Sequence, residues 1–131
     1  AKPWGRLQFQ SEILDRISEL LTKVRLLDVA HSRIRDLAYG YRRLVEIALA
    51  LALNPKILML DEPAAGVPAR DTELILQILK ELPPDLAVLL IEHDMNMVFR
   101  FANRITVLVD GAVLTEGSVE SVRTDERVHQ V

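Results

Sequence analysis

Asp61 and Glu62, directly after the apolar run 57–60, are the residues of this sequence best suited to chemistry. An aspartate followed by a glutamate at a strand end is the arrangement that a phosphoryl-transfer site needs. One carboxylate lies near a Mg²⁺ ion and the next is oriented toward an attacking water. Taken alone, the pair also fits a strand cap that opens a turn at Pro63.

A second polar cluster, Glu92, His93 and Asp94, follows the apolar run 86–91. A histidine between two acids indicates a polar loop rather than a core. Taken alone, His93 also fits a histidine that simply caps a strand end.

The elements around these clusters predict an α/β fold. Short apolar runs alternate with amphipathic helical patterns, which is typical of a mostly parallel sheet with right-handed crossovers and polar chemistry at the carboxyl ends of the strands. Both runs, 57–60 and 86–91, read as strands covered on both faces. The pair Asp110-Gly111 predicts a C-terminal β-hairpin between residues 105–109 and 112–115. The predicted helices span residues 11–27, 42–53, 71–82 and 95–102, with short helical pieces from Ser118 onward.

The two N-terminal helical patterns differ in kind. The first has one apolar face, and the second is apolar on nearly every side, which predicts a buried helix that stops at Asn54-Pro55. The first five residues, 1–5, read as a loop entered from upstream, and the absence of an initial methionine predicts truncation or processing. The apolar face of the first helix consists of Ile13, Leu14, Ile17, Leu20, Leu21, Val24 and Leu27.

Composition narrows the possible functions. A chain of 131 residues predicts one compact unit, and its formal charge of -3 gives no general attraction to nucleic acid or anionic lipid. Without cysteine there is neither a disulfide framework nor a thiolate metal site, and the three histidines lack metal-ligand spacing. The most apolar region, 44–60, contains polar residues that exclude a membrane span.

Three segments, in this order and at these separations, resemble the signature loop, Walker B motif and switch loop of ABC-type nucleotide-binding domains. They are residues 37–43, 57–66 and 91–95. The chain looks most like the subunits of branched-chain amino acid importers. The similarity lies in the sequence of residues 61–65, the Gly-x-Pro that follows it and the tail Glu116-Gly117-Ser118. The resemblance covers the chain from about Ser11 to near its end.

The resemblance implies a role for each matching residue. Asp61 would help hold Mg²⁺ through water, Glu62 would act as general base or water-orienting carboxylate, and His93 would contact the γ-phosphate. The signature loop precedes a helix, whose first N–H groups present a positive dipole end to a phosphate. In the family this loop caps the ATP bound by the opposite subunit. The residues implied to do so here are Leu37, Ala38, Tyr39, Gly40 and Tyr41.

The sequence also departs from the family's usual Leu-Ser-Gly-Gly-Gln. Ala38 replaces the serine, which removes a hydroxyl donor to the γ-phosphate, worth about 1.5–3 kcal/mol. Tyr39 replaces the first glycine, a variation expected in the importer branch, and Tyr41 replaces the glutamine and is expected to pack on the helical subdomain. Pro68 stands where the family usually carries an aspartate that reaches across the dimer, with Asp71 a little beyond.

Four arginines, Arg33, Arg35, Arg42 and Arg43, cluster around the signature loop. They fit a solvated basic face, and alternatively a contact with phosphate. Nucleic acid is not expected as a partner.

No Gly-x-x-x-x-Gly-Lys-Ser/Thr motif and no glutamine loop occurs in the sequence. The resemblance therefore implies a partial P-loop ATPase fold, with residues 1–53 as part of the helical subdomain and 54–131 as the C-terminal part of the core. The parent is expected to hydrolyse ATP with Mg²⁺ and to drive uptake of a small solute. This chain alone is expected neither to bind ATP tightly nor to hydrolyse it.

The implied partners are a second ATPase subunit, transmembrane permease subunits and, indirectly, a periplasmic solute-binding protein. The implied location is cytoplasmic, on the inner face of the plasma membrane. Two alternatives stay open: a stand-alone module that lends its signature loop to a partner, and a part of a soluble ABC-type ATPase. In every case the missing P-loop strand predicts uncovered apolar faces and self-association.

Overall fold

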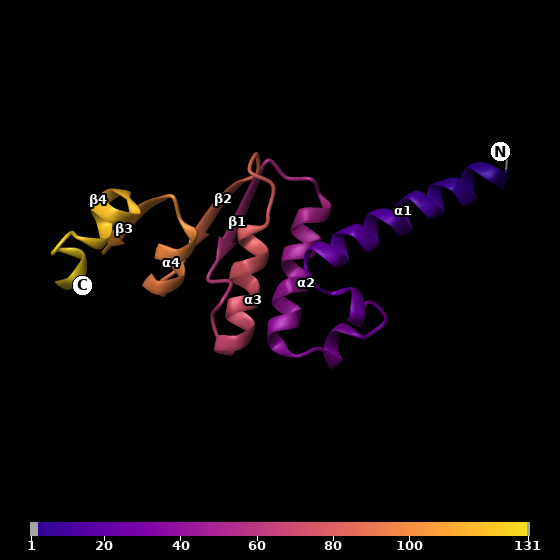
Figure 1. Cartoon of the computed structure of the whole chain (residues 1–131), viewed down its shortest axis with the longest axis horizontal. Helices are drawn as coiled ribbons and strands as arrows, with labels where there is room; N and C mark the ends of the chain where they lie inside the picture. The colour runs from indigo at the N-terminus through magenta and orange to yellow at the C-terminus, as the bar shows by residue number, and fades with distance from the viewer. Residues whose placement is uncertain (1–2, 131) are drawn as a thin grey trace. The chain divides into compact units, whose positions relative to one another are not determined.

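The computed structural model describes residues 3–130, with side chains from Gln10 onward, and its helices and strands are drawn in Figure 1. The chain divides into two compact units, so the prediction of a single unit is wrong. The first comprises Ala1–Met59 and Pro63–Leu89, and the second comprises Leu60–Glu62 and Leu90–Val131. The reason is that the C-terminal hairpin region has a core of its own, in which Met97, Ile105 and Val122 are buried.

Helix α1 (Pro3–Lys23) begins the first unit. The predicted loop at residues 1–5 is wrong from Pro3 onward, while Ala1 and Lys2 lie outside the described residues. A helix tolerates proline at its first position because the N–H of that residue needs no partner within the helix.

The C-terminal end of α1 comes earlier than the predicted residue 27. Arg25 adopts a left-handed φ of 58°, and the N–H of Leu26 donates to the carbonyl of Leu21 at 2.8 Å, which is a Schellman-type end. The apolar face is covered only near this end. Val24 and Leu26 are buried, whereas Leu14 is 62% exposed.

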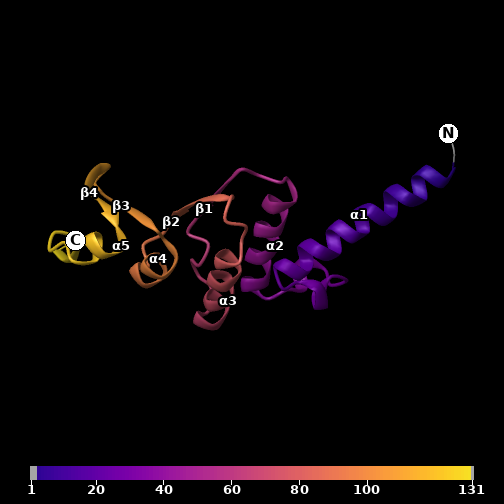
Figure 2. The same ribbon diagram turned by 45° about the horizontal axis from the view of Figure 1, so that its top comes forward.

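Helices α2 (Tyr39–Ala52) and α3 (Ala69–Lys80) pack against each other in the first unit and lie side by side in both views (Figures 1 and 2). The buried residues of α2 include Leu44, Ile47 and Ala48, which recur at helical spacing on one face. The prediction that this helix is buried on nearly every side is wrong, because Leu49 is 64% exposed. Helices α1 and α3 pack against α2 and leave Leu49 exposed.

Strands β1 (Ile57–Asp61) and β2 (Ala87–Ile91) form a two-stranded sheet. The N–H of Ala87 donates to the carbonyl of Lys56 at 3.1 Å, and the N–H of Glu62 donates to the carbonyl of Ile91 at 2.9 Å. The start of one strand therefore pairs with the start of the other and the end with the end, so the two strands are parallel. The predicted parallel pair joined by a helix is confirmed.

The prediction that these strands are covered on both faces is wrong. Leu58 is buried, but the alternate residues Ile57, Met59 and Leu89 are 62%, 69% and 50% exposed. Successive side chains of a strand point to opposite faces, so one face of the sheet packs and the other is uncovered. We call Ile57, Met59 and Leu89 the open sheet face.

The second unit contains α4 (Met95–Phe101) and the antiparallel strands β3 (Arg104–Val109) and β4 (Ala112–Ser118). Asp110 and Gly111 both have positive φ, 50° and 78°, as a two-residue hairpin turn requires. The predicted hairpin is confirmed, with a bulge between Val107 and Leu108.

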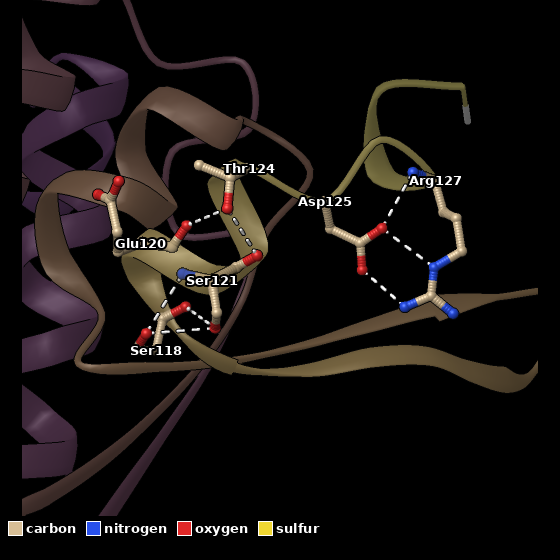
Figure 3. A network of polar contacts seen from close by, with 6 residues as sticks. All are labelled: Ser118, Glu120, Ser121, Thr124, Asp125 and Arg127. Carbon is tan, nitrogen blue, oxygen red and sulfur yellow. Dashed lines mark hydrogen bonds and ion pairs between the residues drawn. The ribbon is translucent and has the colours of Figure 1, made fainter.

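A network of polar contacts links residues within the segment 118–127, which follows this hairpin (Figure 3). Helix α5 (Val119–Arg123) begins at Ser118, whose hydroxyl accepts from the N–H of Ser121. Beyond α5, Arg127 forms a bidentate ion pair with Asp125, with Nη2 2.6 Å from Oδ2 and Nε 3.0 Å from Oδ1. These bonds from Arg127 lower the pKa of Asp125 well below its usual range. A short 3₁₀ helix, Val128–Gln130, follows.

Among the described residues, none of the helices combines the length and the apolar character that crossing a bilayer requires.

Candidate functional site

Asp61 and Glu62 lie where β1 ends, as the sequence predicts. Glu62 has a left-handed φ of 44°, which turns the chain away from the strand direction immediately after its N–H has bonded to Ile91. A non-glycine residue in this conformation is uncommon and is tolerated where the surrounding structure holds it. Here the hydrogen bond from its N–H to the carbonyl of Ile91 in β2 holds it.

His93 lies just beyond the end of the neighbouring strand, and its side chain meets that of Glu62. His93 Nδ1 is 3.1 Å from Glu62 Oε1. Both side chains are open to solvent, with 76% of His93 and 49% of Glu62 exposed. The carboxyl ends of two paired strands therefore bring together two residues 31 positions apart in the sequence.

The two acids that flank His93 have different roles. Asp94 is the N-cap of α4, and its carboxylate accepts from the N–H groups of Asn96 and Met97 at 2.9 and 3.4 Å. Glu92 Oε2 accepts from the N–H of His93 at 3.2 Å. Asp94 therefore caps the N-terminus of α4, whereas Glu92 accepts a hydrogen bond from the backbone of His93.

Asp61 is exposed beside Glu62. Within the described part of the chain no group of three or more histidine or acidic side chains is placed to enclose a metal ion. Mg²⁺ commonly keeps several waters and takes one or two carboxylates together with phosphate oxygens. An exposed aspartate at a strand end therefore fits Mg²⁺ held through water, and it does not fit an all-protein metal cage.

The signature segment, residues 37–41, lies at the start of α2 in the first unit. The predicted loop before a helix at residue 42 is wrong for Tyr39, Gly40 and Tyr41, which belong to the first turn of α2. Leu37 is buried and anchors the segment, Ala38 is the N-cap, and Tyr39 is 44% exposed. Ala38 offers no side-chain bond to the helix N–H groups. Gly40 is buried and Tyr41 is half-buried.

Three of the four nearby arginines make contacts within the chain, and the first of them, Arg35, has its Nε 3.7 Å from Asp36 Oδ1. Arg42 donates from Nε to the carbonyl of Leu37 and from Nη2 to that of Arg35, both at 2.9 Å, and so braces the 3₁₀ turn Ile34–Asp36 that precedes the segment. Arg43 lies over the ring of Tyr39, 5.2 Å from its centroid.

Arg43 also bonds Glu46 at 2.7 Å, and this bond raises its pKa. The sequence did not predict the hydrogen bonds from Arg42 to the carbonyls of Leu37 and Arg35, because a side-chain bond to a carbonyl leaves no pattern in the sequence.

The turn after β1 lies against the signature segment inside the first unit. A Cβ placed on Gly40 would stand 2.6 Å from Cβ and from Oδ2 of Asp71, and a Cβ on Gly66 would stand 3.7 Å from the ring of Tyr39. Sequence reasoning noted Asp71 only as an acid near an expected position. Its contact with Gly40 was not foreseen.

Comparisons with known proteins agree with these segments. The family model described as "ABC transporter" matches residues 4–65. The branched-chain amino acid transport ATP-binding protein LivG of Escherichia coli K12 is 40% identical over 121 residues, which are 91% of this chain and 48% of LivG. The corresponding protein BraF of Pseudomonas aeruginosa is 36% identical over the same shares.

The fold has solved counterparts. MJ1267, an ATP-binding cassette of an ABC transporter, superposes with a TM-score of 0.81 at 28% identity, covering 91% of this chain and 49% of that one. The chain therefore belongs to the ABC transporter ATPase family and is a partial ABC ATPase domain. Its similarity to LivG and BraF places its relatives among ATP-binding proteins for branched-chain amino acid transport, and it spans about half their length.

Proposed function

We propose that this chain supplies the hydrolytic and signature segments of an importer ATPase that couples ATP hydrolysis to uptake of branched-chain amino acids. The contact of His93 Nδ1 with Glu62 Oε1 at 3.1 Å supports this most directly, because it joins the two side chains that the reaction needs. Residues 1–53 form part of the helical subdomain, and residues 54–131 form the C-terminal part of the core.

Glu62 is the base that orients and deprotonates the attacking water. Its Oε1 is engaged by His93, which leaves Oε2 to accept from a water. A general base must lie within hydrogen-bond reach of the proton that it removes, and an exposed carboxylate at a strand end meets that condition.

His93 contacts the γ-phosphate of the substrate. With Nδ1–H donating to the Glu62 carboxylate, Nε2 is the ring nitrogen that faces the phosphate, and it donates there when the ring is protonated. Glu62 thus fixes the orientation of the imidazole as well as acting on water. When bound beside Asp61, Mg²⁺ supplies positive charge that neutralises the phosphate oxygens.

The signature segment Leu37 to Tyr41 caps the ATP held by a second ATPase subunit, and the first N–H groups of α2 face that phosphate. Ala38 contributes no hydroxyl, so the backbone carries this contact. The further partners are permease subunits in the membrane and, through them, a periplasmic binding protein, with the ATPase on the cytoplasmic face of the plasma membrane.

A hybrid cassette tests the proposal. This chain replaces the aligned part of E. coli LivG, so that LivG supplies the remaining half with its phosphate-binding elements. We expect the hybrid to hydrolyse Mg·ATP and the chain alone to show no hydrolysis. A folded hybrid that binds Mg·ATP without hydrolysing it would refute the proposed roles of Glu62 and His93.

A further inference from the structure

Helices α2 and α3 both begin without a side-chain cap. The N-cap residues are Ala38 and Pro68, and neither makes a side-chain hydrogen bond to the first turn of its helix. The first four N–H groups of a helix have no partner within the helix, so the start of an uncapped helix depends on packing against its neighbours for its position. Two adjacent helices therefore need the same kind of support.

Asp71 is placed to support both. It lies in the first turn of α3, of which it is the acidic residue, and its side chain lies directly against Gly40 in the first turn of α2. A Cβ on Gly40 would stand 2.6 Å from Asp71 Cβ, 2.6 Å from Oδ2 and 2.9 Å from Cγ. The aspartate side chain thus fills the space that any other residue at position 40 would need.

A second contact joins the same two segments. Gly66, with a φ of 70°, turns the chain after β1, and a Cβ there would lie 3.7 Å from Cε1 of Tyr39. Thr72 accompanies Asp71 and donates from Oγ1 to Pro68 at 3.3 Å, which holds the turn onto α3. Two neighbouring residues, Tyr39 and Gly40, therefore lie near two positions of the other segment, Gly66 and Asp71.

We propose that Asp71 is a positioning residue that acts within its own chain, holding the first turn of α2, and with it Tyr39 and Gly40, against the turn at residues 66–71. The inference rests on the proposed function only in treating residues 37–41 as the part that faces nucleotide.

The two tyrosines of the chain, Tyr39 and Tyr41, both lie in the signature segment. Incorporation of 3-fluorotyrosine into the whole chain therefore gives two ¹⁹F resonances that report on this segment alone, and Tyr39→Phe assigns them. No nucleotide is added, so the outcome is independent of whether the hybrid cassette hydrolyses ATP.

We expect Asp71→Ala to shift the Tyr39 resonance by more than its linewidth, because the carboxyl group that lies against Gly40 is removed. Asp71→Asn, which keeps the shape, should restore the resonance to its original position. Ile75→Val, a core change in the same helix, is the control for general destabilisation: it should lower Tm and leave both resonances in place.

Unchanged tyrosine resonances in Asp71→Ala would overturn the proposal. So would an equal shift in Ile75→Val, because the tyrosines would then report loss of stability rather than loss of a specific contact. A shift in Asp71→Asn as large as that in Asp71→Ala would also overturn the packing role assigned to this side chain.

Discussion

The two segments proposed to act on ATP are held in place by different means. The Glu62–His93 site is built by backbone geometry: two strands pair, and the residues directly after them meet. The signature segment is built by side chains, with Arg42 bonding two carbonyls and Asp71 filling the space at Gly40. A site of the first kind follows from strand order, whereas a site of the second kind depends on particular contacts.

The strongest test of this comparison is the removal of the carboxylate charge from the strand-end site. Glu62→Gln in the LivG hybrid keeps the shape and the bond to β2 but removes the base, so we expect hydrolysis to fall by about 10²- to 10⁴-fold. Steady-state phosphate release measures it. Glu126→Gln, a change at an exposed glutamate in the C-terminal tail, is the matched control and should leave the rate unchanged.

If Glu62→Gln retains the full rate, another group removes the proton and the strand-end site does not perform the chemistry. Normal folding of the variant, checked by circular dichroism, separates this result from loss of structure.

Gly40→Ala tests the signature segment, which is held in place by side-chain contacts. Alanine in place of glycine ordinarily stabilises a helix by about 0.5–1 kcal/mol. Here the added methyl group would collide with Asp71, so we expect a loss of about 1–3 kcal/mol in the free energy of unfolding, measured by urea titration. Adding Asp71→Gly removes the colliding atoms and should restore most of the loss. A stabilised Gly40→Ala chain would show that the two helices are not in close contact.

The open sheet face shows that strand pairing alone does not bury the apolar side chains of a strand. Ile57, Met59 and Leu89 are at least half exposed, and such a patch favours association between copies. We expect Met59→Lys to raise the dissociation constant for self-association by about tenfold, the effect of losing roughly 1.4 kcal/mol. Sedimentation velocity over a concentration series measures it.

Leu108→Lys is the control, because Leu108 is 64% exposed but belongs to the hairpin of the second unit. A wild-type chain that stays monomeric at high concentration would show that the open sheet face does not drive association.

The smallest effect is expected in the C-terminal tail, which is also built by side chains. Arg127 lowers the pKa of Asp125, so the stabilisation from this contact is present above the ordinary aspartate pKa of about 3.9 and is lost as the pH falls below it. Asp125→Asn should lower Tm by a few degrees at most at pH 7, and the difference from wild type should shrink on acidification. Asp110→Asn, in the hairpin turn, should behave like wild type. A difference that grows toward low pH would contradict the assignment.

The same distinction explains how much the sequence alone could predict. Local patterns and turn residues place β1, β2, α3, α4 and the hairpin at Asp110-Gly111, and strand order then brings Glu62 to His93. Exposure of Met59 and Leu49 was mispredicted, because apolar runs indicate what can be buried and not what is present to cover it.

The side-chain contacts were not predictable for a related reason. Gly40 and Asp71 are far apart in the sequence, and neither residue type reveals the other as its neighbour. The early end of α1 depends likewise on Arg25 adopting a left-handed φ, which is uncommon for a residue other than glycine.

We propose that this chain provides the water-orienting and signature segments, and that the phosphate-binding elements come from the other half of the cassette. Calorimetric titration of Mg·ATP into the isolated chain and into the LivG hybrid carrying Glu62→Gln tests it most directly. We expect saturable binding to the hybrid and no measurable heat of binding to the isolated chain. Tight binding of Mg·ATP by the isolated chain would contradict the proposal.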